Sequence, residues 1–214
     1  MVVRGTRAVR EFPQIDREAE AAALQTVFFA DAEFEGRPTR KSLANYLAFL
    51  SLRGPEIGAE IEKLRSLFAG HRVEVLEHDV ICLLMARNWR LHNIACVFLA
   101  TGFVTERSLG ALWQCIHAGS WASPQLVATA AYIDRDFEQK ACHLLTQHST
   151  YFKSIVPLAE ILRAEHGSVW LEDTSASINL REAQEIDRDN SGAIGLGWLA
   201  NLRVALGHSF QRLI

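Results

Sequence analysis

Two serines close to a tryptophan are the first side chains in this sequence that could do chemistry. They lie in GSWASPQL, residues 119–126, as Ser120 and Ser123. A nucleophilic serine of the hydrolase type stands in a GxSxG turn after a strand, and this stretch has neither the motif nor a strand pattern before it. Ser123 followed by Pro124 is instead typical of a helix start, with the serine as N-cap and the proline at the first helical position. We therefore expect a tight turn at Ser120 and no catalytic residue in this stretch.

Metal ligands are the second candidate, in HRVEVLEHDV, residues 71–80. His71, Glu74 and His78 are spaced i, i+3 and i+7, which places them on one face of a helix. The adjacent His78 and Asp79 resemble the paired ligands of the HD-type phosphohydrolases, an all-α family. That family has another histidine one or two helices earlier, whereas no histidine precedes His71 here. Two alternatives remain: a divalent-metal hydrolase site made of these four residues, or a helix face that is exposed to water.

A calcium loop is the third candidate, because DRDNSGAIGLGW, residues 187–198, is similar to one. Asp187, Asp189 and Ser191 occupy its first, third and fifth positions. The twelfth position, which should supply a bidentate glutamate, is Trp198. The same side chains form Asx turns and a helix cap without any ion. The sequence therefore leaves calcium binding and a simple helix cap as alternatives.

The elements that must position these residues are helices, because apolar side chains recur at i, i+3, i+4 and i+7 along most of the chain. We find no convincing alternating strand pattern, apart from a short extended piece at 169–171. The class is therefore all-α, with about ten helices. The expected helices span residues 15–29, 42–50, 55–68, 73–86, 89–101, 178–187 and 194–206, and four more begin near Thr105, Ser123, Asp134 and Ser154.

A repeat of 32 residues, the separation between Trp89 and Trp121, relates two neighbouring parts of the chain. It places Asn93 over Gln125 and also aligns the apolar residues of the preceding helices. A third copy, continuing toward Lys153, is degenerate. A repeat of helix pairs predicts a solenoid of HEAT or armadillo type, although the periods of those families are somewhat longer. Chance matching of apolar helices is the alternative.

The two segments RNWRLHNIACVFLATG and LWQCIHAGSWASPQLVATAAYIDRDFE resemble bacterial helical-repeat proteins, some of which are similar to immunity proteins that neutralise a cognate toxin. The resemblance covers residues 73–147, and its motifs are helix-packing motifs. It implies an α-solenoid and a protein partner, and it assigns no catalytic residue. We expect one domain over residues 1–214, with an N-terminal arm at 1–12, a repeat core at 73–165 and an acidic C-terminal cap at 166–214.

Polar positions on successive inner helices of such a solenoid would form a ladder on one surface. The binding residues predicted in this way are Arg87, Arg90, His92, Asn93, Gln125 and Tyr132. Arginines and aromatic residues are frequent anchors of protein interfaces, which favours binding. The alternative is structural: Arg90 and His92 would bind backbone carbonyl groups at helix turns, while Trp89 and Trp121 would separate adjacent layers.

The charge balance bears on the kind of partner. The chain has 22 basic and 25 acidic side chains and a net charge of −3, which argues against a nucleic-acid or anionic-membrane binder. Residues 165–189 hold seven acidic side chains against two arginines. This acidic stretch is either a solvated loop region or a binding patch for a basic partner.

Cysteine usage and hydropathy indicate the compartment. Cys82, Cys96, Cys115 and Cys142 lie inside apolar helical runs without a CxxC motif, which predicts buried, reduced thiols. The N-terminal stretch has no apolar core of a signal peptide, and the longest apolar runs are too short to cross a membrane. We expect a cytoplasmic protein without a cofactor that binds another protein, most concretely an immunity protein that blocks the active site of a toxin.

Overall fold

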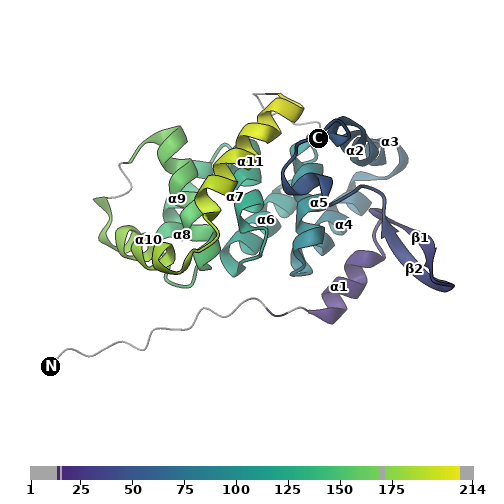
Figure 1. Cartoon of the computed structure of the whole chain (residues 1–214), viewed down its shortest axis with the longest axis horizontal. Helices are drawn as coiled ribbons and strands as arrows, with labels where there is room; N and C mark the ends of the chain where they lie inside the picture. The colour runs from purple at the N-terminus through teal and green to yellow at the C-terminus, as the bar shows by residue number, and fades with distance from the viewer. Residues whose placement is uncertain (1–13, 15, 169–171, 208–214) are drawn as a thin grey trace.

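The protein is mostly helical in a computed structural model that describes residues 14, 16–168 and 172–207 (Figure 1). Helix accounts for 67% of these residues, which confirms the all-α class. The expected N-terminal arm at 1–12 and the extended piece at 169–171 lie outside the described residues. The helices are α1 (Arg17–Leu24), η1 (Ala48–Leu50), α2 (Ile57–Arg65), α3 (Leu67–Gly70), α4 (Val73–Met85), α5 (Trp89–Ala100), α6 (Glu106–Ala118), α7 (Ser123–Ile133), α8 (Phe137–Thr146), α9 (Phe152–His166), α10 (Thr174–Ile186) and α11 (Ser191–Leu206).

A β-hairpin near the N-terminus corrects the expectation that no strand is present. Strands β1 (Phe29–Phe34) and β2 (Arg37–Ser42) pair antiparallel and project from one end of the molecule (Figure 1). Glu35 and Gly36 join them, and both have positive φ angles, as a two-residue hairpin turn requires. The strands escaped prediction because most of their side chains are exposed on both faces, so no alternation of apolar and polar residues marks them.

The segment 42–50 is a second correction, because it is not the predicted helix. It runs through turns into the single 3₁₀ turn η1. Leu43 and Leu47, which the helical pattern placed on a buried stripe, are exposed, whereas Phe49 is fully buried. The predicted first helix, 15–29, likewise ends at Leu24 and gives way to the hairpin.

Helices α5 and α7 form the centre of the core. All residues from Leu91 to Ala100 of α5 are buried, and α7 is nearly as enclosed. A helix that is apolar all round must be covered on several sides. Helix α5 packs against α2, α4 and α7, while α7 also packs against α6, α9 and α11. The two most enclosed helices therefore lie next to each other at the centre of the core.

Helix α11 closes the structure by returning to its N-terminal third. It packs along α7 and α9 (Figure 1). The Trp198 indole Nε1 donates a hydrogen bond of 2.9 Å to the Phe49 carbonyl, and the Asn201 amide donates one of 2.8 Å to the Ser51 carbonyl. In a solenoid each repeat contacts only its neighbours. The contacts of α11 with the N-terminal third do not follow this rule, so the HEAT-like solenoid is not confirmed, although the all-α class is.

Ser123 is not the N-cap of α7 that the sequence predicted. Ala122 holds that position, and Ser123 is the first helical residue and fully buried. Its hydroxyl oxygen accepts hydrogen bonds from the Ser120 N–H at 3.1 Å and from the Ser154 hydroxyl at 2.9 Å. Ser123 therefore fixes the turn before α7 and connects it to α9.

The four cysteines are free, as predicted. Cys96 and Cys115 are buried, and burial raises the pKa of the Cys96 thiol to about 12. Cys82 and Cys142 are only partly buried, which corrects the expectation of four enclosed thiols.

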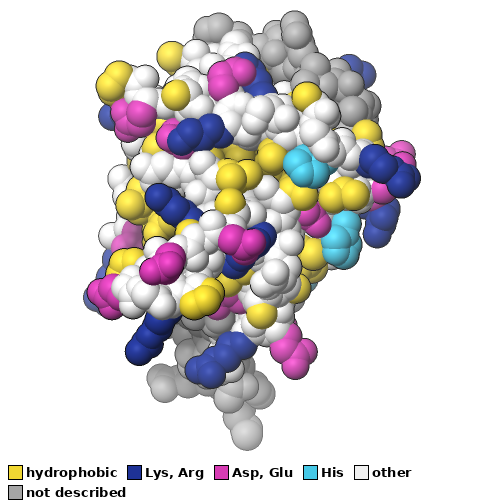
Figure 2. Space-filling view, turned by 90° about the vertical axis from the view of Figure 1, so that its right-hand side faces the viewer, with side chains coloured by type: hydrophobic (Ala, Val, Ile, Leu, Met, Phe, Trp, Pro, Cys, Tyr) yellow, Lys and Arg dark blue, Asp and Glu magenta, His cyan; other side chains and the backbone are white. Residues whose placement is uncertain are grey.

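Charged side chains of both signs are intermixed on the surface that faces the viewer in Figure 2, the right-hand end of Figure 1. Basic residues do not gather into one patch on the described part of that face. Apolar side chains lie between the charges. This distribution agrees with the nearly balanced charge of the sequence.

Candidate functional site

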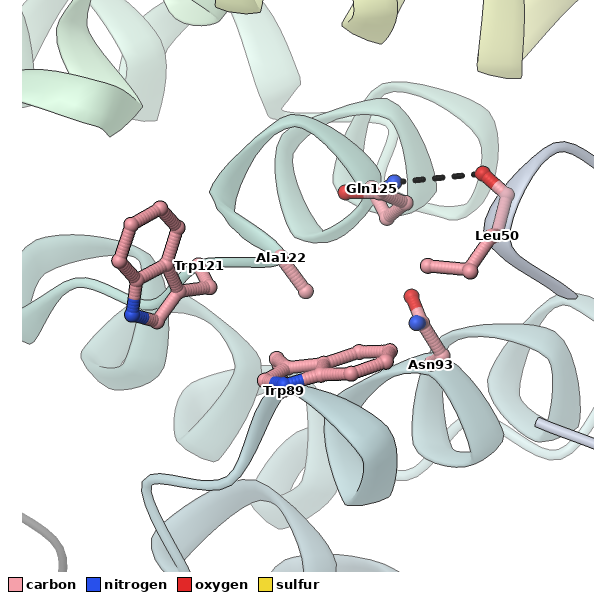
Figure 3. Close-up of a pocket in the computed structure, with 6 residues that line it drawn as sticks. All are labelled: Leu50, Trp89, Asn93, Trp121, Ala122 and Gln125. Atoms are coloured by element: carbon pink, nitrogen blue, oxygen red, sulfur yellow. Dashed lines mark hydrogen bonds between the residues drawn. The ribbon is translucent and has the colours of Figure 1, made fainter. Parts of the chain in front are cut away.

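A pocket of about 250 Å³ lies where η1, α5 and α7 meet. It contains two tryptophans and two carboxamide side chains (Figure 3). The lining residues are Leu50, Trp89, Asn93, Trp121, Ala122 and Gln125.

The sequence repeat explains why these residue types meet here. Trp89 begins α5, and Asn93 follows one helical turn later on the same face. One repeat further, Trp121 lies in the turn before α7, and Gln125 lies in the first turn of that helix. Because α5 and α7 pack against each other, the two copies of the aromatic–amide pair line one pocket.

The carboxamide groups in the pocket are poorly paired. The side chain of Asn93 is 0% exposed, and neither its Nδ2 nor its Oδ1 has a hydrogen-bond partner among the described residues. Gln125 donates through Nε2 to the Leu50 carbonyl at 3.4 Å, the outer limit for such a bond, and its Oε1 is unpaired in the same way. Buried polar groups in folded proteins are almost always hydrogen-bonded, so two amides with unpaired atoms in one pocket are a functional signal.

Aromatic and cationic side chains form the rim of the pocket. The Arg90 guanidinium lies 4.7 Å from the centre of the Trp89 ring, and Tyr46 packs edge-on against the same ring at 5.8 Å. Trp121 is 57% exposed, and the Lys153 ammonium lies 4.0 Å from its ring centre. Arg90 is exposed and forms no ion pair within the described part of the chain. The rim therefore combines a large apolar area with an available positive charge.

Trp121 corrects the expectation that both tryptophans act as buried wedges between layers. Trp89 is half-buried, and Trp121 is largely exposed. Trp121 lies in a turn, whereas Trp89 lies on a helix. The repeat alignment therefore matched their sequence positions but could not predict the burial of Trp121. Tyr46 and Leu50 were missed because the segment that carries them was assigned to a helix.

His92 lies behind the pocket and not on its surface, which corrects its assignment to a binding ladder. It is 0% exposed, and its Nε2 donates to the Leu84 carbonyl at 3.1 Å. Its Nδ1 therefore accepts from the Ser120 hydroxyl at 2.6 Å. Burial lowers the pKa of the His92 imidazole to about 4, so the ring is neutral at pH 7. The structural alternative, a histidine bound to a backbone carbonyl, is confirmed for this residue.

The remaining predicted residues are spread over the molecule. Tyr132, at the other end of α7, is buried and donates from its hydroxyl to the Gly207 carbonyl at 3.1 Å. Arg87 is exposed in the turn before α5, with a φ of +46°. The structure therefore brings Arg90, Asn93 and Gln125 together at the pocket and places the other predicted residues elsewhere.

The residues of the alternative metal site do not converge. The Asp79 carboxylate accepts a hydrogen bond from the Val27 N–H at 2.8 Å, and the Nδ1 of His71 contacts the Leu67 carbonyl. Glu74 pairs with Arg72 at 3.2 Å on an exposed surface. Over the described ranges, no three His, Cys, Asp or Glu side chains are grouped so that they could hold a metal ion. The hydrolase alternative based on His71, Glu74, His78 and Asp79 is therefore not supported by the geometry.

The calcium-like stretch is a helix cap. The Asp187 carboxylate accepts hydrogen bonds from the Ser191 N–H and hydroxyl, at 2.9 and 2.8 Å, at the start of α11. Asp189 turns away and pairs with Lys153. The acids that would share a calcium ion thus have separate structural roles. Other acids of the C-terminal region are also engaged, since Glu165 pairs with Arg203 and Asp173 caps α10.

None of the described helices is both long and apolar enough to cross a membrane. Comparison of the chain with protein-family models, with curated proteins and with solved structures finds no match. The resemblance to helical-repeat and immunity proteins therefore stays a prediction.

Proposed function

We propose that this chain is a non-enzymatic protein that binds another protein through the pocket between η1, α5 and α7. One observation supports this proposal most: Trp121, largely exposed, lines a pocket together with Trp89 and the amide of Asn93, which has no hydrogen-bond partner among the described residues. An exposed tryptophan is costly in water and is a frequent anchor in protein interfaces.

The composition of the rim agrees with this proposal. Tryptophan, tyrosine and arginine are the residue types enriched at the energetic centres of interfaces. Here Tyr46, Trp89 and Arg90 pack on one another at the edge of the pocket. Their mutual contacts hold the side chains in place, which lowers the entropy lost when a partner binds.

The size of the pocket favours part of a large partner over a free small molecule. Sites for drug-sized ligands usually enclose about 300–1,000 Å³, whereas this pocket has about 250 Å³. It accommodates a side chain or a short stretch of backbone. A macromolecular partner would supply the rest of the binding energy by covering the exposed rim.

Neutralisation of a toxin is the most concrete form of the proposal. It rests on the resemblance of residues 87–102 and 112–138 to helical-repeat proteins of the immunity type. In this mechanism the rigid surface around the pocket covers the active site or substrate groove of the toxin. No catalytic group of this chain is needed.

Site-specific crosslinking tests the proposed function. A photoreactive phenylalanine analogue replaces Arg90 or Trp121 in the rim, and Gln139, exposed on α8, provides the control position. We expect both rim positions to crosslink to the same protein and the α8 position not to do so. Equal crosslinking from all three positions would reject the pocket as the interface.

Reconstitution with the identified partner completes the test. An anchor residue of an interface contributes at least about 2 kcal/mol, so Trp121→Ala should weaken the purified complex by about 30-fold or more. If the partner is a toxin, its expression alone should stop growth, and co-expression of the wild-type chain, but not of Trp121→Ala, should restore it. A partner that is harmless alone would remove the immunity role and leave protein binding in place.

A further inference from the structure

We propose that the pocket takes an extended main-chain segment of the partner. In this arrangement the N–H and C=O of one residue of the segment pair with the Asn93 carboxamide, and a neighbouring aliphatic side chain lies between Trp89 and Trp121. This inference rests on the proposed function and specifies the chemistry of the partner at that same site.

The Asn93 side chain has the hydrogen-bonding groups that a peptide backbone complements. Its Nδ2 donates and its Oδ1 accepts, side by side. A residue in an extended segment offers one C=O and one N–H, which can satisfy both atoms at once. Both Asn93 atoms are buried and unpaired among the described residues, and an unmade hydrogen bond of a buried amide is destabilising. One extended residue of a partner, through its N–H and C=O, would remove this penalty.

Gln125 extends the same pattern by one repeat. Its Oε1 is also unpaired, and its Nε2 makes only a long bond to the Leu50 carbonyl. The two carboxamides come from adjacent helices and line the same pocket. Gln125 can therefore accept from an N–H further along the same segment. The pair of amides would recognise backbone, whatever side chains the segment carries outside the pocket.

Leu50 is the side chain that the segment must displace. In Figure 3 its side chain lies next to those of Gln125 and Asn93, which line the same pocket. Leu50 is 41% exposed and ends the single turn η1, so it is held less firmly than a residue inside a long helix. In the proposed complex this side chain rotates toward solvent and makes room for the segment beside Asn93.

The other residues that line the pocket determine which side chain fits next to the residue that pairs with Asn93. Trp89 and Trp121 offer aromatic surface on two sides, and Ala122 is a small apolar residue between them (Figure 3). These walls suit an aliphatic side chain. The exposed Arg90 guanidinium beside Trp89 forms no ion pair with another described residue, which favours an acidic residue nearby in the segment. The expected ligand is therefore an extended stretch with an aliphatic residue close to an acidic residue.

Nucleic acid is a weaker candidate for the same pocket. Amides and tryptophans also suit a nucleobase, but affinity for nucleic acid depends on several phosphate contacts from lysine or arginine. The net charge is −3, and Lys153, the second cation at the rim, is paired with Asp189. The charge therefore favours a peptide.

Selection from a phage-displayed library of random 12-residue peptides tests the inference on the full-length chain. We expect enrichment of peptides with an aliphatic residue next to an acidic one. Synthetic versions of the best peptide are then N-methylated at one residue at a time. Methylation removes a single backbone N–H, and at one core position it should weaken binding by at least about tenfold, a loss of about 1.4 kcal/mol.

Protein variants provide the second arm. Asn93→Leu should weaken the peptide by at least about tenfold while the chain stays folded. Gln139→Leu on α8 is the matched control and should bind like the wild type. Failure to enrich any peptide, a flat N-methyl scan, or wild-type affinity in Asn93→Leu would each overturn the inference.

The two proposals fail separately. If the protein found by crosslinking at position 121 binds Asn93→Leu as well as it binds the wild type, the backbone pairing is wrong and the protein-binding function stands. If that protein also tolerates Trp121→Ala, the proposed function is wrong as well. A single-stranded oligonucleotide serves as the competitor probe, and its binding at the pocket in place of peptides would reject the peptide assignment.

Discussion

Asn93 is expected to lower the stability of the unbound protein. Its carboxamide is buried and unpaired among the described residues, and such a group costs about 1–3 kcal/mol relative to a satisfied one. Leucine has the same number of side-chain heavy atoms, branched in the same way, and no polar atoms. We therefore expect Asn93→Leu to raise the free energy of unfolding by about 1 kcal/mol, measured by urea denaturation.

Asn179 provides the matched control for this prediction. It is also 0% exposed and its Oδ1 is likewise unpaired among the described residues, but its Nδ2 donates to the Leu145 carbonyl at 2.8 Å. Asn179→Leu removes that bond and leaves a buried carbonyl with less hydrogen bonding, so its free energy of unfolding should fall by about 1–3 kcal/mol. Equal losses in the two variants would show that Asn93 contributes to stability like an ordinary buried asparagine.

His92 predicts a pH dependence of stability. Burial lowers the pKa of its imidazole in the folded protein to about 4, from an ordinary value of 6.5. Between these values the unfolded chain binds a proton that the folded chain does not. Stability from this residue is therefore complete above pH 6.5 and decreases as the pH falls toward 4, by up to roughly 3 kcal/mol.

Urea denaturation between pH 7 and pH 4.5 measures this effect. We expect His92→Gln to be less stable at pH 7 and to lose less stability than the wild type on acidification. His148→Gln, at an exposed position, is the control and should follow the wild-type curve. Parallel curves for wild type and His92→Gln would contradict the buried neutral imidazole.

The turn between α6 and α7 leads to a prediction for whole elements. Gly119 ends α6 with a φ of +94°, and a Cβ placed there would lie 2.1 Å from the Cγ of Tyr151. Gly119→Ala combines backbone strain with this clash, so we expect a loss of at least about 2–3 kcal/mol and a lower melting temperature. Because this turn presents Trp121, partner binding should weaken too.

Gly110 is the control for this glycine. It lies within α6, and a methyl group on its Cα would point into open space, so alanine fits there without strain. Gly110→Ala should stabilise the protein by about 0.5–1 kcal/mol because alanine is the better helix former. Similar melting temperatures for the two alanine variants would show that the turn tolerates a side chain.

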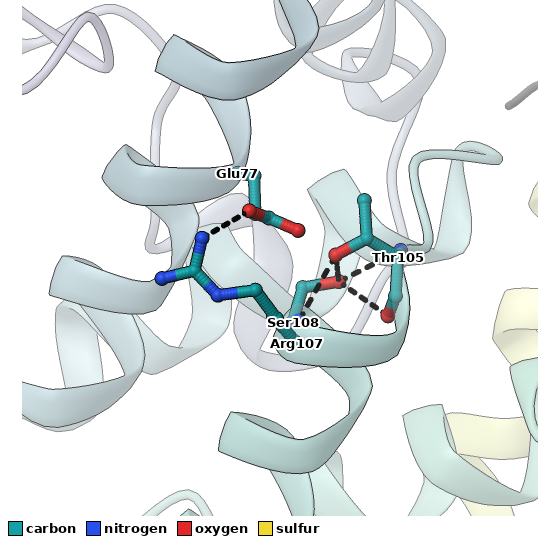
Figure 4. A network of polar contacts seen from close by, with 4 residues as sticks. All are labelled: Glu77, Thr105, Arg107 and Ser108. Atoms are coloured by element: carbon teal, nitrogen blue, oxygen red, sulfur yellow. Dashed lines mark hydrogen bonds and ion pairs between the residues drawn. The ribbon is translucent and has the colours of Figure 1, made fainter.

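Elements with strong local signals could be predicted from the sequence. Thr105 is the predicted N-cap of α6, where its hydroxyl and that of Ser108 form a capping box (Figure 4). Next to them Arg107 pairs with Glu77 of α4 at 2.7 Å (Figure 4). Cap chemistry and apolar periodicity depend on residues close in sequence, so α4–α7 were predicted within a few residues.

The hairpin could not be predicted because its strands are exposed on both faces, and η1 could not because its structure depends on a distant contact. The stretch 42–50 has a helical apolar pattern, yet the Phe49 carbonyl accepts from Trp198 and the segment stays in turns. Prediction of the pocket was limited in the same way. The aromatic–amide repeat of α5 and α7 was visible in the sequence, whereas the Leu50 wall was not, because it comes from that misassigned stretch.

At the scale of the whole molecule, alanine variants of two tryptophans distinguish a residue needed for stability from one needed for binding. Trp198 is 2% exposed and joins α11 to η1, so Trp198→Ala should cost about 3–5 kcal/mol and unfold much of the chain near physiological temperature. Trp121→Ala should change the free energy of unfolding by less than about 1 kcal/mol, because more than half of the side chain is already exposed. Circular dichroism melts of the two variants measure the difference. A large loss of stability in Trp121→Ala would show instead that this side chain packs between adjacent layers.

The hydrogen bond from Trp198 to Phe49 spans 149 positions of the chain and sets the order of events during synthesis. The ribosome releases the N-terminal segment first, and domains begin to fold as they emerge. The α5–α7 part of the pocket can form while translation continues, but the Leu50 wall has no anchor until α11 has left the exit tunnel. A nascent chain stalled before Ser191 would therefore carry an unfinished pocket, and recognition of a partner would begin only after α11 has been released.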